Sequence, residues 1–100
     1  MKDKNCFISG PITNDPDYFD KFAKAEYEIC QLGLQPVNPT KLVPYNKDWT
    51  FEQYIREDIR HLLDCNHIYM LDGWQNSSGA KIELDLANTL KMNIIMQSKN

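Results

Sequence analysis

The chain has 100 residues, of which 42% are hydrophobic and 25% are charged, a composition typical of a globular domain rather than a disordered segment. Its formal net charge is −3, and the 11 basic residues are scattered among 14 acidic ones, which argues against a nucleic-acid-binding surface. No apolar run approaches the roughly 20 residues of a membrane span, and no signal-peptide core is present. We therefore expect one cytoplasmic domain over residues 1–100 that contacts neither nucleic acid nor membrane.

Four elements are expected in the first half of the chain: a strand over residues 6–9, a helix over 15–32, a strand over 34–37 and a polar loop over 38–50. Gly10-Pro11 ends the first strand. A proline in the first turn and Gly33 after the last turn are typical helix boundaries.

Five elements are expected in the second half: a helix over 50–64, a strand over 67–71, a loop over 72–78, a helix over 79–91 and a strand over 93–96. Thr50 is a suitable N-cap for the first of these helices. The order βαβαβαβ predicts a three-layer α/β domain, flavodoxin-like or Rossmann-like, with a four-stranded parallel sheet and right-handed crossovers.

Ligands of such open sheets bind beyond the carboxyl ends of the strands. The segments expected to converge there are 10–14, 38–49, 72–78 and the residues after Met96. These loops contain both tryptophans, Trp49 and Trp74, which could stack on a base or form contacts between subunits.

The three cysteines, Cys6, Cys30 and Cys65, are odd in number, widely spaced and each in an apolar context. This pattern predicts buried, reduced thiols rather than a disulfide framework or a zinc site.

Glu83 lies on the apolar side of the last predicted helix. At about 100° per residue it falls within an arc formed by Ile82, Leu86 and Leu90. An unpaired carboxylate facing the sheet would cost several kcal/mol. The side chain leans over the small residues one turn earlier, towards the positive N-terminal end of the helix. We interpret Glu83 as a carboxylate in a pocket, the structural alternative being a buried acid paired with a backbone amide or a lysine.

Asp58 also faces inward, between Phe51 and Tyr54 of the preceding helix. Glu26 does the same on the first helix, beside Phe19, Phe22 and Cys30, but it lies roughly 15 Å from the leading end of that helix. An inward carboxylate in this chain can therefore be structural.

Three motifs carry a family resemblance. The segments Phe7–Ile12, Arg56–Ile59 with Leu63–Asn66, and Ser78–Glu83 resemble, in order, the opening strand and loop, the helix acid and the nucleophile motif of nucleoside 2-deoxyribosyltransferase-like proteins. With Gly73-Trp74 ahead of the last motif, the chain is most similar to the short DUF4406 family.

The resemblance implies cleavage of an N-glycosidic bond without metal or cofactor. Glu83 would attack C1′ of a deoxyribose to give a glycosyl-enzyme, and Asp58 would protonate the departing base or orient a water. The two carboxyl groups would then lie about 5 Å apart.

The resemblance also implies the contacts of a small-molecule nucleoside or nucleotide. Ser77 stands where nucleoside-specific relatives have aspartate and monophosphate hydrolases have serine, which favours a 5′-monophosphate. The residues expected to bind substrate are Ser9, Gly10, Pro11, Asp72, Trp74, Ser77, Ser78 and Gly79. Gly10 is expected to permit close backbone approach to a ligand, with a plain tight turn as the alternative, whereas Asp72 could equally serve only to begin a turn.

The leading hypothesis is thus an N-glycosidase or deoxyribosyltransferase acting on a 2′-deoxynucleoside or its 5′-monophosphate. The alternatives are a non-catalytic nucleotide-binding module and an NAD-type glycohydrolase. We also expect a homo-oligomer, because the open sheet has edges and the loops carry tryptophans.

Overall fold

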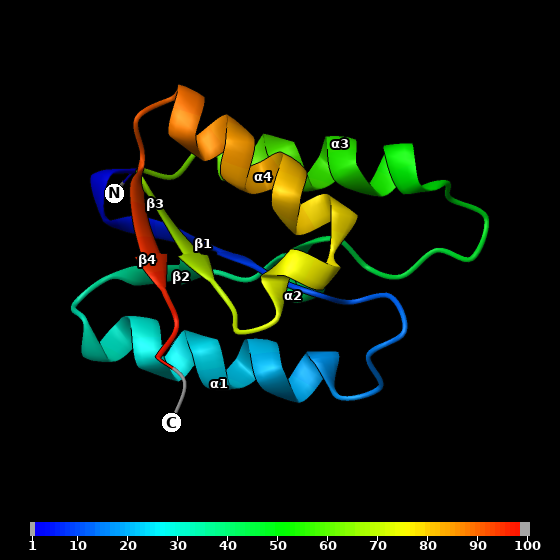
Figure 1. Ribbon diagram of the computed structural model, residues 1–100, viewed down its shortest axis with the longest axis horizontal. Coiled ribbons are helices and arrows are strands. Elements are labelled where there is room, and N and C mark those ends of the chain that lie inside the picture. The colour runs from blue at the N-terminus through cyan, green and yellow to red at the C-terminus, as the bar shows by residue number, and fades with distance from the viewer. Residues whose placement is uncertain (1, 99–100) are drawn as a thin grey trace.

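The computed structural model describes residues 2–98, in which strands and helices alternate (Figure 1). In chain order the elements are the 3-10 helix η1 (Lys2–Lys4), β1 (Asn5–Ser9), α1 (Tyr18–Gln31), β2 (Gln35–Val37), α2 (Pro39–Leu42), α3 (Phe51–Leu62), β3 (His67–Met70), the 3-10 helix η2 (Trp74–Asn76), α4 (Ser78–Thr89) and β4 (Asn93–Met96).

The four strands form one parallel sheet in the order β2-β1-β3-β4. Phe7 of β1 pairs with Val37 of β2 on one side and with Ile68 of β3 on the other. The predicted four-stranded parallel α/β fold is confirmed. In the sheet, β2 lies on one side of β1, whereas β3 and β4 lie on the other side. The strand order therefore reverses at β1, and a crevice is expected beyond the carboxyl end of this strand.

Helices cover both faces of the sheet, with α1 on one face and α3 and α4 on the other (Figure 1). Alternate residues of each strand pack on opposite faces of the sheet, because successive strand side chains point to opposite sides. The α1 side holds Cys6, Ile8, Phe22, Ala25, Ile29, Tyr69 and Leu71. The α3–α4 side holds Phe7, Leu62, Cys65, Ile68, Met70, Ala80 and Ala87.

Two short helices lie in segments that were predicted as loops. Pro39 begins α2, which is capped by the Asn38 side chain accepting from the Thr40 amide at 3.0 Å. Proline suits this first helical position because its missing N–H would have no partner there. Similarly, η2 follows Gly73, whose φ of 88° is accessible to glycine.

The face that α1 buries differs from the predicted one. Phe22, Ala25 and Ile29 are buried, whereas Phe19 and Cys30 are exposed, so the prediction of three buried thiols is wrong for Cys30. The helix turns Phe22, Ala25 and Ile29 towards the sheet and leaves the flanking positions of the predicted arc in solvent.

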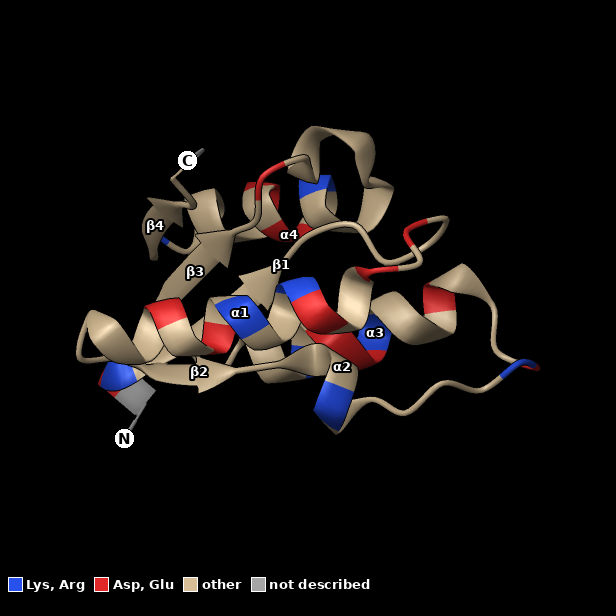
Figure 2. Cartoon of the chain, turned by 90° about the horizontal axis from the view of Figure 1, so that it is seen from below, with Lys and Arg blue, Asp and Glu red and all other residues tan. Residues whose placement is uncertain are grey.

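Glu26 is partly buried and pairs with Lys41 of α2 at 2.9 Å. This inward acid therefore has the structural role that was expected of it. Acidic and basic residues are interspersed along α1 (Figure 2). Within residues 2–98, no helix is both long and apolar enough to cross a membrane.

Candidate active site

A pocket of about 850 Å³ opens beyond the carboxyl end of β1, a size typical of small-molecule sites. Its walls come from the segments after β1 and β2, from one side of α3 and from the start of α4. Three of the four segments expected to converge thus contribute to it. Gln97, after β4, lines a separate pocket of about 190 Å³.

Glu83 lies in the wall of the large pocket and is only 4% exposed. It sits on the buried face of α4 with Ala80 and Ala87, so the predicted inward orientation is confirmed. The predicted arc was nevertheless displaced, since Ile82 is 41% and Leu90 47% exposed. Alanines on the inner face bring α4 close to the sheet, and its larger aliphatic side chains flank that contact.

Glu83 has two polar neighbours. The Ser9 hydroxyl, at the end of β1, donates to Glu83 Oε1 at 2.5 Å. The Asp58 side chain of α3 lines the same pocket and lies close enough to Glu83 for the two carboxyl groups to interact. Two carboxyl groups can hydrogen-bond only if one of them carries a proton, so a single proton at this site would be shared by the pair.

Burial dominates the electrostatics of the pair. It raises the pKa of Glu83 above the ordinary glutamate range, and the nearby Asp58 charge raises it further, whereas the Ser9 hydrogen bond opposes the shift. Burial also raises the pKa of Asp58. Because the two carboxyl groups are neighbours, ionisation of one disfavours ionisation of the other, and their titrations are coupled.

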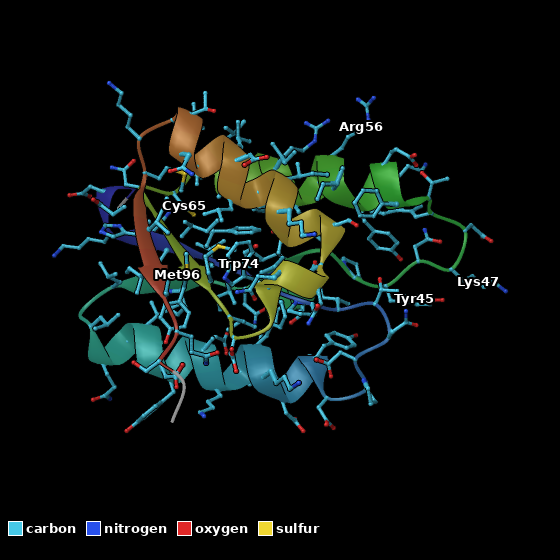
Figure 3. All side chains as sticks on the ribbon, in the orientation of Figure 1. Tyr45, Lys47, Arg56, Cys65, Trp74 and Met96 are labelled. Atoms are coloured by element: carbon cyan, nitrogen blue, oxygen red, sulfur yellow. The ribbon has the colours of Figure 1, made fainter. Side chains whose placement is uncertain are left out.

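No cation approaches this pair in the part of the chain that the structure describes. The residues lining the pocket include no Lys, Arg or His, and Asp58 and Glu83 are its only acids. Arg56, on α3 beside Asp58, points away from the sheet, and Lys47 extends outward from the tip of its loop (Figure 3). The structural alternative for Glu83, a salt bridge with lysine, is absent among the ion pairs of residues 2–98.

The N-terminus of α4 forms one wall of the pocket. The Ser77 side chain caps the helix by accepting from the Ala80 amide at 3.1 Å, and Ser78 and Gly79 follow it. A Cβ on Gly79 would lie 3.4 Å from Ile55 Cδ1, so the glycine allows α3 and α4 to meet closely here. The partial positive charge of a helix N-terminus faces the pocket.

Gly10 and Pro11 continue β1 into the pocket wall. A Cβ on Gly10 would lie 2.7 to 2.9 Å from three side-chain atoms of Leu71. Glycine is therefore required at this position for packing against Leu71 in the neighbouring segment, and the expected approach of its backbone to a ligand stays a prediction.

Four aromatic residues form a further part of the pocket wall, here called the aromatic wall: Tyr45, Trp49, Phe51 and Tyr54. The Trp49 and Tyr54 rings meet edge to face at 5.2 Å. Of these four residues, only Trp49 was expected from the sequence to contact a base. The signal for the others was the density of aromatic residues just after the second strand.

Asp72 and Trp74 line the small pocket and not the large one. Trp74 packs against the core on the α3–α4 side of the sheet (Figure 3). The Asp72 amide donates to Gln97 Oε1 at 2.8 Å. The turn into η2 carries both residues away from the carboxyl pair, so the structure does not bring these two expected substrate contacts to the site.

Among residues 2–98, no group of three or more His, Cys, Asp or Glu side chains is placed to hold a metal ion. Cys6 and Cys65 are buried, and burial raises the pKa of each thiol to about 12.

A family model described as a domain of unknown function, DUF4406, matches residues 4–96. No curated protein matches the sequence. Among solved structures, the chain is similar to a 2-deoxyribosyltransferase from the psychrotolerant bacterium Bacillus psychrosaccharolyticus, with a TM-score of 0.70 at 18% identity. The match covers 96% of this chain and 77% of that one. At this identity the likeness shows a shared fold.

Proposed function

Because this chain belongs to the DUF4406 family and shares its fold with a 2-deoxyribosyltransferase, we propose that it cleaves the N-glycosidic bond of a 2′-deoxynucleoside or its 5′-monophosphate. The observation that carries the proposal is that the carboxyl groups of Asp58 and Glu83 lie beside each other in the wall of a pocket of small-molecule size. Adjacent carboxyl groups suit a retaining mechanism. An inverting mechanism needs carboxyl groups roughly 6.5 to 9.5 Å apart, with a water between them.

In the first step, a Glu83 carboxylate oxygen bonds to C1′ of the sugar. The bond from C1′ to the base breaks, its electron pair goes to the base nitrogen, and the Asp58 carboxyl gives that base a proton. In the second step, water attacks C1′ and releases Glu83, and the proton of that water returns to Asp58. A second base in place of water gives transfer instead of hydrolysis.

The reaction requires the shared proton on Asp58. In the free protein the deeper burial of Glu83 favours the proton there. The hydrogen bond between the two carboxyl groups supplies a direct route for moving the proton to Asp58 when substrate enters.

The walls of the pocket suit the two halves of a nucleoside. The aromatic wall formed by Tyr45, Trp49, Phe51 and Tyr54 offers ring faces and edges to a planar base. The carboxyl pair faces the sugar, and the start of α4 offers hydroxyl groups and a positive helix end.

The charge of the pocket favours an uncharged deoxynucleoside as the substrate. Two acids and no cation line it, so a phosphate dianion would gain no ion pair and would meet a negative site. The serine-rich N-terminus of α4 favours the second candidate, the 5′-monophosphate, because such a terminus binds anions.

The test is to incubate the protein separately with each deoxynucleoside, each deoxynucleoside 5′-monophosphate and NAD, and to follow released base by chromatography. Release should fall by at least about 10³-fold in Glu83→Gln and stay unchanged in Asp85→Asn, a matched change at an exposed position of α4. Binding without release would instead indicate a nucleotide-binding module. Nicotinamide release would indicate an NAD-type glycohydrolase.

A further inference from the structure

Ser9 is the last residue of β1 and is 1% exposed. The residue was expected to contact substrate, yet it does not line the pocket, although Ile8 and Gly10 on either side do. Its hydroxyl instead points to the α4 side of the sheet, where it donates to Glu83 Oε1. Ser9 thus stands behind the acid, away from the ligand space.

The backbone of Ser9 is held firmly by the sheet. It pairs with Met70 in the parallel register, and its carbonyl accepts from the Leu71 amide at 2.9 Å. A serine hydroxyl can donate only one hydrogen bond. The donor directed at Glu83 is therefore fixed in position by the strand and committed to one acceptor.

We propose that Ser9 is a positioning residue that holds the Glu83 side chain beside the pocket and favours its ionised form, so that the proton shared by the two acids is available on Asp58. This inference rests on the proposed function. Ser9 touches neither the substrate nor the reacting atoms, and it acts only through Glu83.

The direction of the effect follows from hydrogen bonding to a carboxylate. A donated hydrogen bond stabilises the charged form, and the one from Ser9 lowers the pKa of Glu83 against the upward effect of burial. Without this donor, the shared proton would lie on Glu83 in a larger fraction of molecules. A protonated Glu83 cannot attack C1′, so turnover would fall while the walls that bind substrate stay the same.

The experiment measures kcat and KM for base release between pH 5 and 9 in the native protein, Ser9→Ala and Ser9→Thr. Ser9→Ala should lower kcat by about 10- to 100-fold at neutral pH, leave KM within about twofold and move the acidic limb of the profile to higher pH. Ser9→Thr keeps the hydroxyl and should recover most of the rate. Loss of kcat with no movement of the limb, or an equal loss in both variants when both remain folded, would overturn the proposal.

A second measurement does not depend on turnover. Carboxyl carbon NMR follows the titration of Glu83 in the native protein and in Ser9→Ala, with Glu83→Gln identifying its resonance. An upward shift in Ser9→Ala supports the role of Ser9 even if no base is released, in which case the proposed function fails alone. An unchanged titration overturns the role of Ser9 and leaves the proposed function standing.

Discussion

Asp58 on α3 and Glu83 on α4 bring their carboxyl groups together in one pocket wall, although neither residue has a lysine or arginine partner among the ion pairs of residues 2–98. Charged groups in protein interiors normally have a partner of opposite charge, because desolvation of an isolated charge is costly. A pair that instead shares one proton is typical of sites that use acids for chemistry.

The first prediction concerns stability and pH. Burial raises the pKa of Glu83 above its ordinary value of 4.5, so above that pH the folded protein binds more protons than the unfolded chain. The free energy of unfolding must then fall as pH rises. Glu83→Gln removes this penalty and should be more stable than the native protein by about 1–3 kcal/mol at pH 8, with the gain vanishing near pH 4. Urea unfolding at a series of pH values measures it.

Asp85→Asn, at an exposed site on the same helix, provides the control for that series and should unfold like the native protein throughout. A Glu83→Gln variant that is less stable at pH 8 than at pH 4, relative to native, would show that Glu83 is held as a stabilising carboxylate.

The second prediction concerns Asp58 as the proton donor. Asp58→Asn should lower the rate of base release by about 10²- to 10⁴-fold for an ordinary deoxynucleoside, because the departing base then leaves without a proton. A deoxyriboside with a p-nitrophenolate leaving group departs without protonation and should lose far less. Steady-state rates on both substrates measure the difference.

Asp64→Asn is the matched control for Asp58→Asn. Asp64 is an exposed acid just after α3 and does not line the pocket, so the rates of this variant should match those of the native protein. Equal losses on both leaving groups in Asp58→Asn would assign Asp58 to substrate binding instead.

The third prediction concerns the packing of Gly10. A methyl group there would lie within 2.9 Å of three atoms of Leu71, so Gly10→Ala should destabilise the fold by about 1–3 kcal/mol. Leu71→Ala removes Cγ and Cδ1, two of the three atoms, and keeps Cβ, so the double variant should be more stable than the sum of the two single changes predicts but should recover only part of the loss. Thermal and urea unfolding of the four proteins measure the coupling. Simple additivity would mean that Leu71 Cγ and Cδ1 do not contribute to the clash.

The fourth prediction concerns the loop that follows α2. The Tyr54 hydroxyl donates to the Asn46 carbonyl at 2.6 Å and accepts from the Asn46 amide, which fastens residues 43–50 to α3. Tyr54→Phe should speed amide hydrogen exchange in this loop and raise KM several-fold with little change in kcat, because it loosens one wall of the pocket.

Tyr27→Phe removes a hydroxyl from an exposed tyrosine on α1 and should change neither measurement. A fall in kcat at constant KM in Tyr54→Phe would place the Tyr54 hydroxyl in the chemical step.

The sheet and the orientation of Glu83 could be predicted from sequence because both depend on local periodicity. Short apolar runs between helical segments specify strands, and one glutamate among apolar helix positions faces inward. The precise face of α4 could not be predicted in this way. Ile82 fits a hydrophobic arc as well as Ala80 does, and only the close fit of alanines against the sheet decides between them.

The partners of Glu83 were harder to foresee. Ser9 precedes it by 74 residues, and their hydrogen bond depends on which face of β1 the serine occupies once α4 is packed. Most of the aromatic wall also escaped prediction. Tyr45 lies in residues 38–50, which were expected to be an irregular loop, whereas in the structure α2 begins that segment and the Tyr54 hydroxyl binds the Asn46 backbone.

The two parts of the pocket have separate anchors. The carboxyl pair belongs to helices packed on the sheet, whereas Tyr45 and Trp49 belong to one surface segment held at its ends by the Asn38 and Thr50 caps. Insertions and exchanges within that segment need not disturb either helix. Under the proposed chemistry, related chains can differ in the nucleobase that they accept and still cleave the glycosidic bond with the same two carboxyl groups.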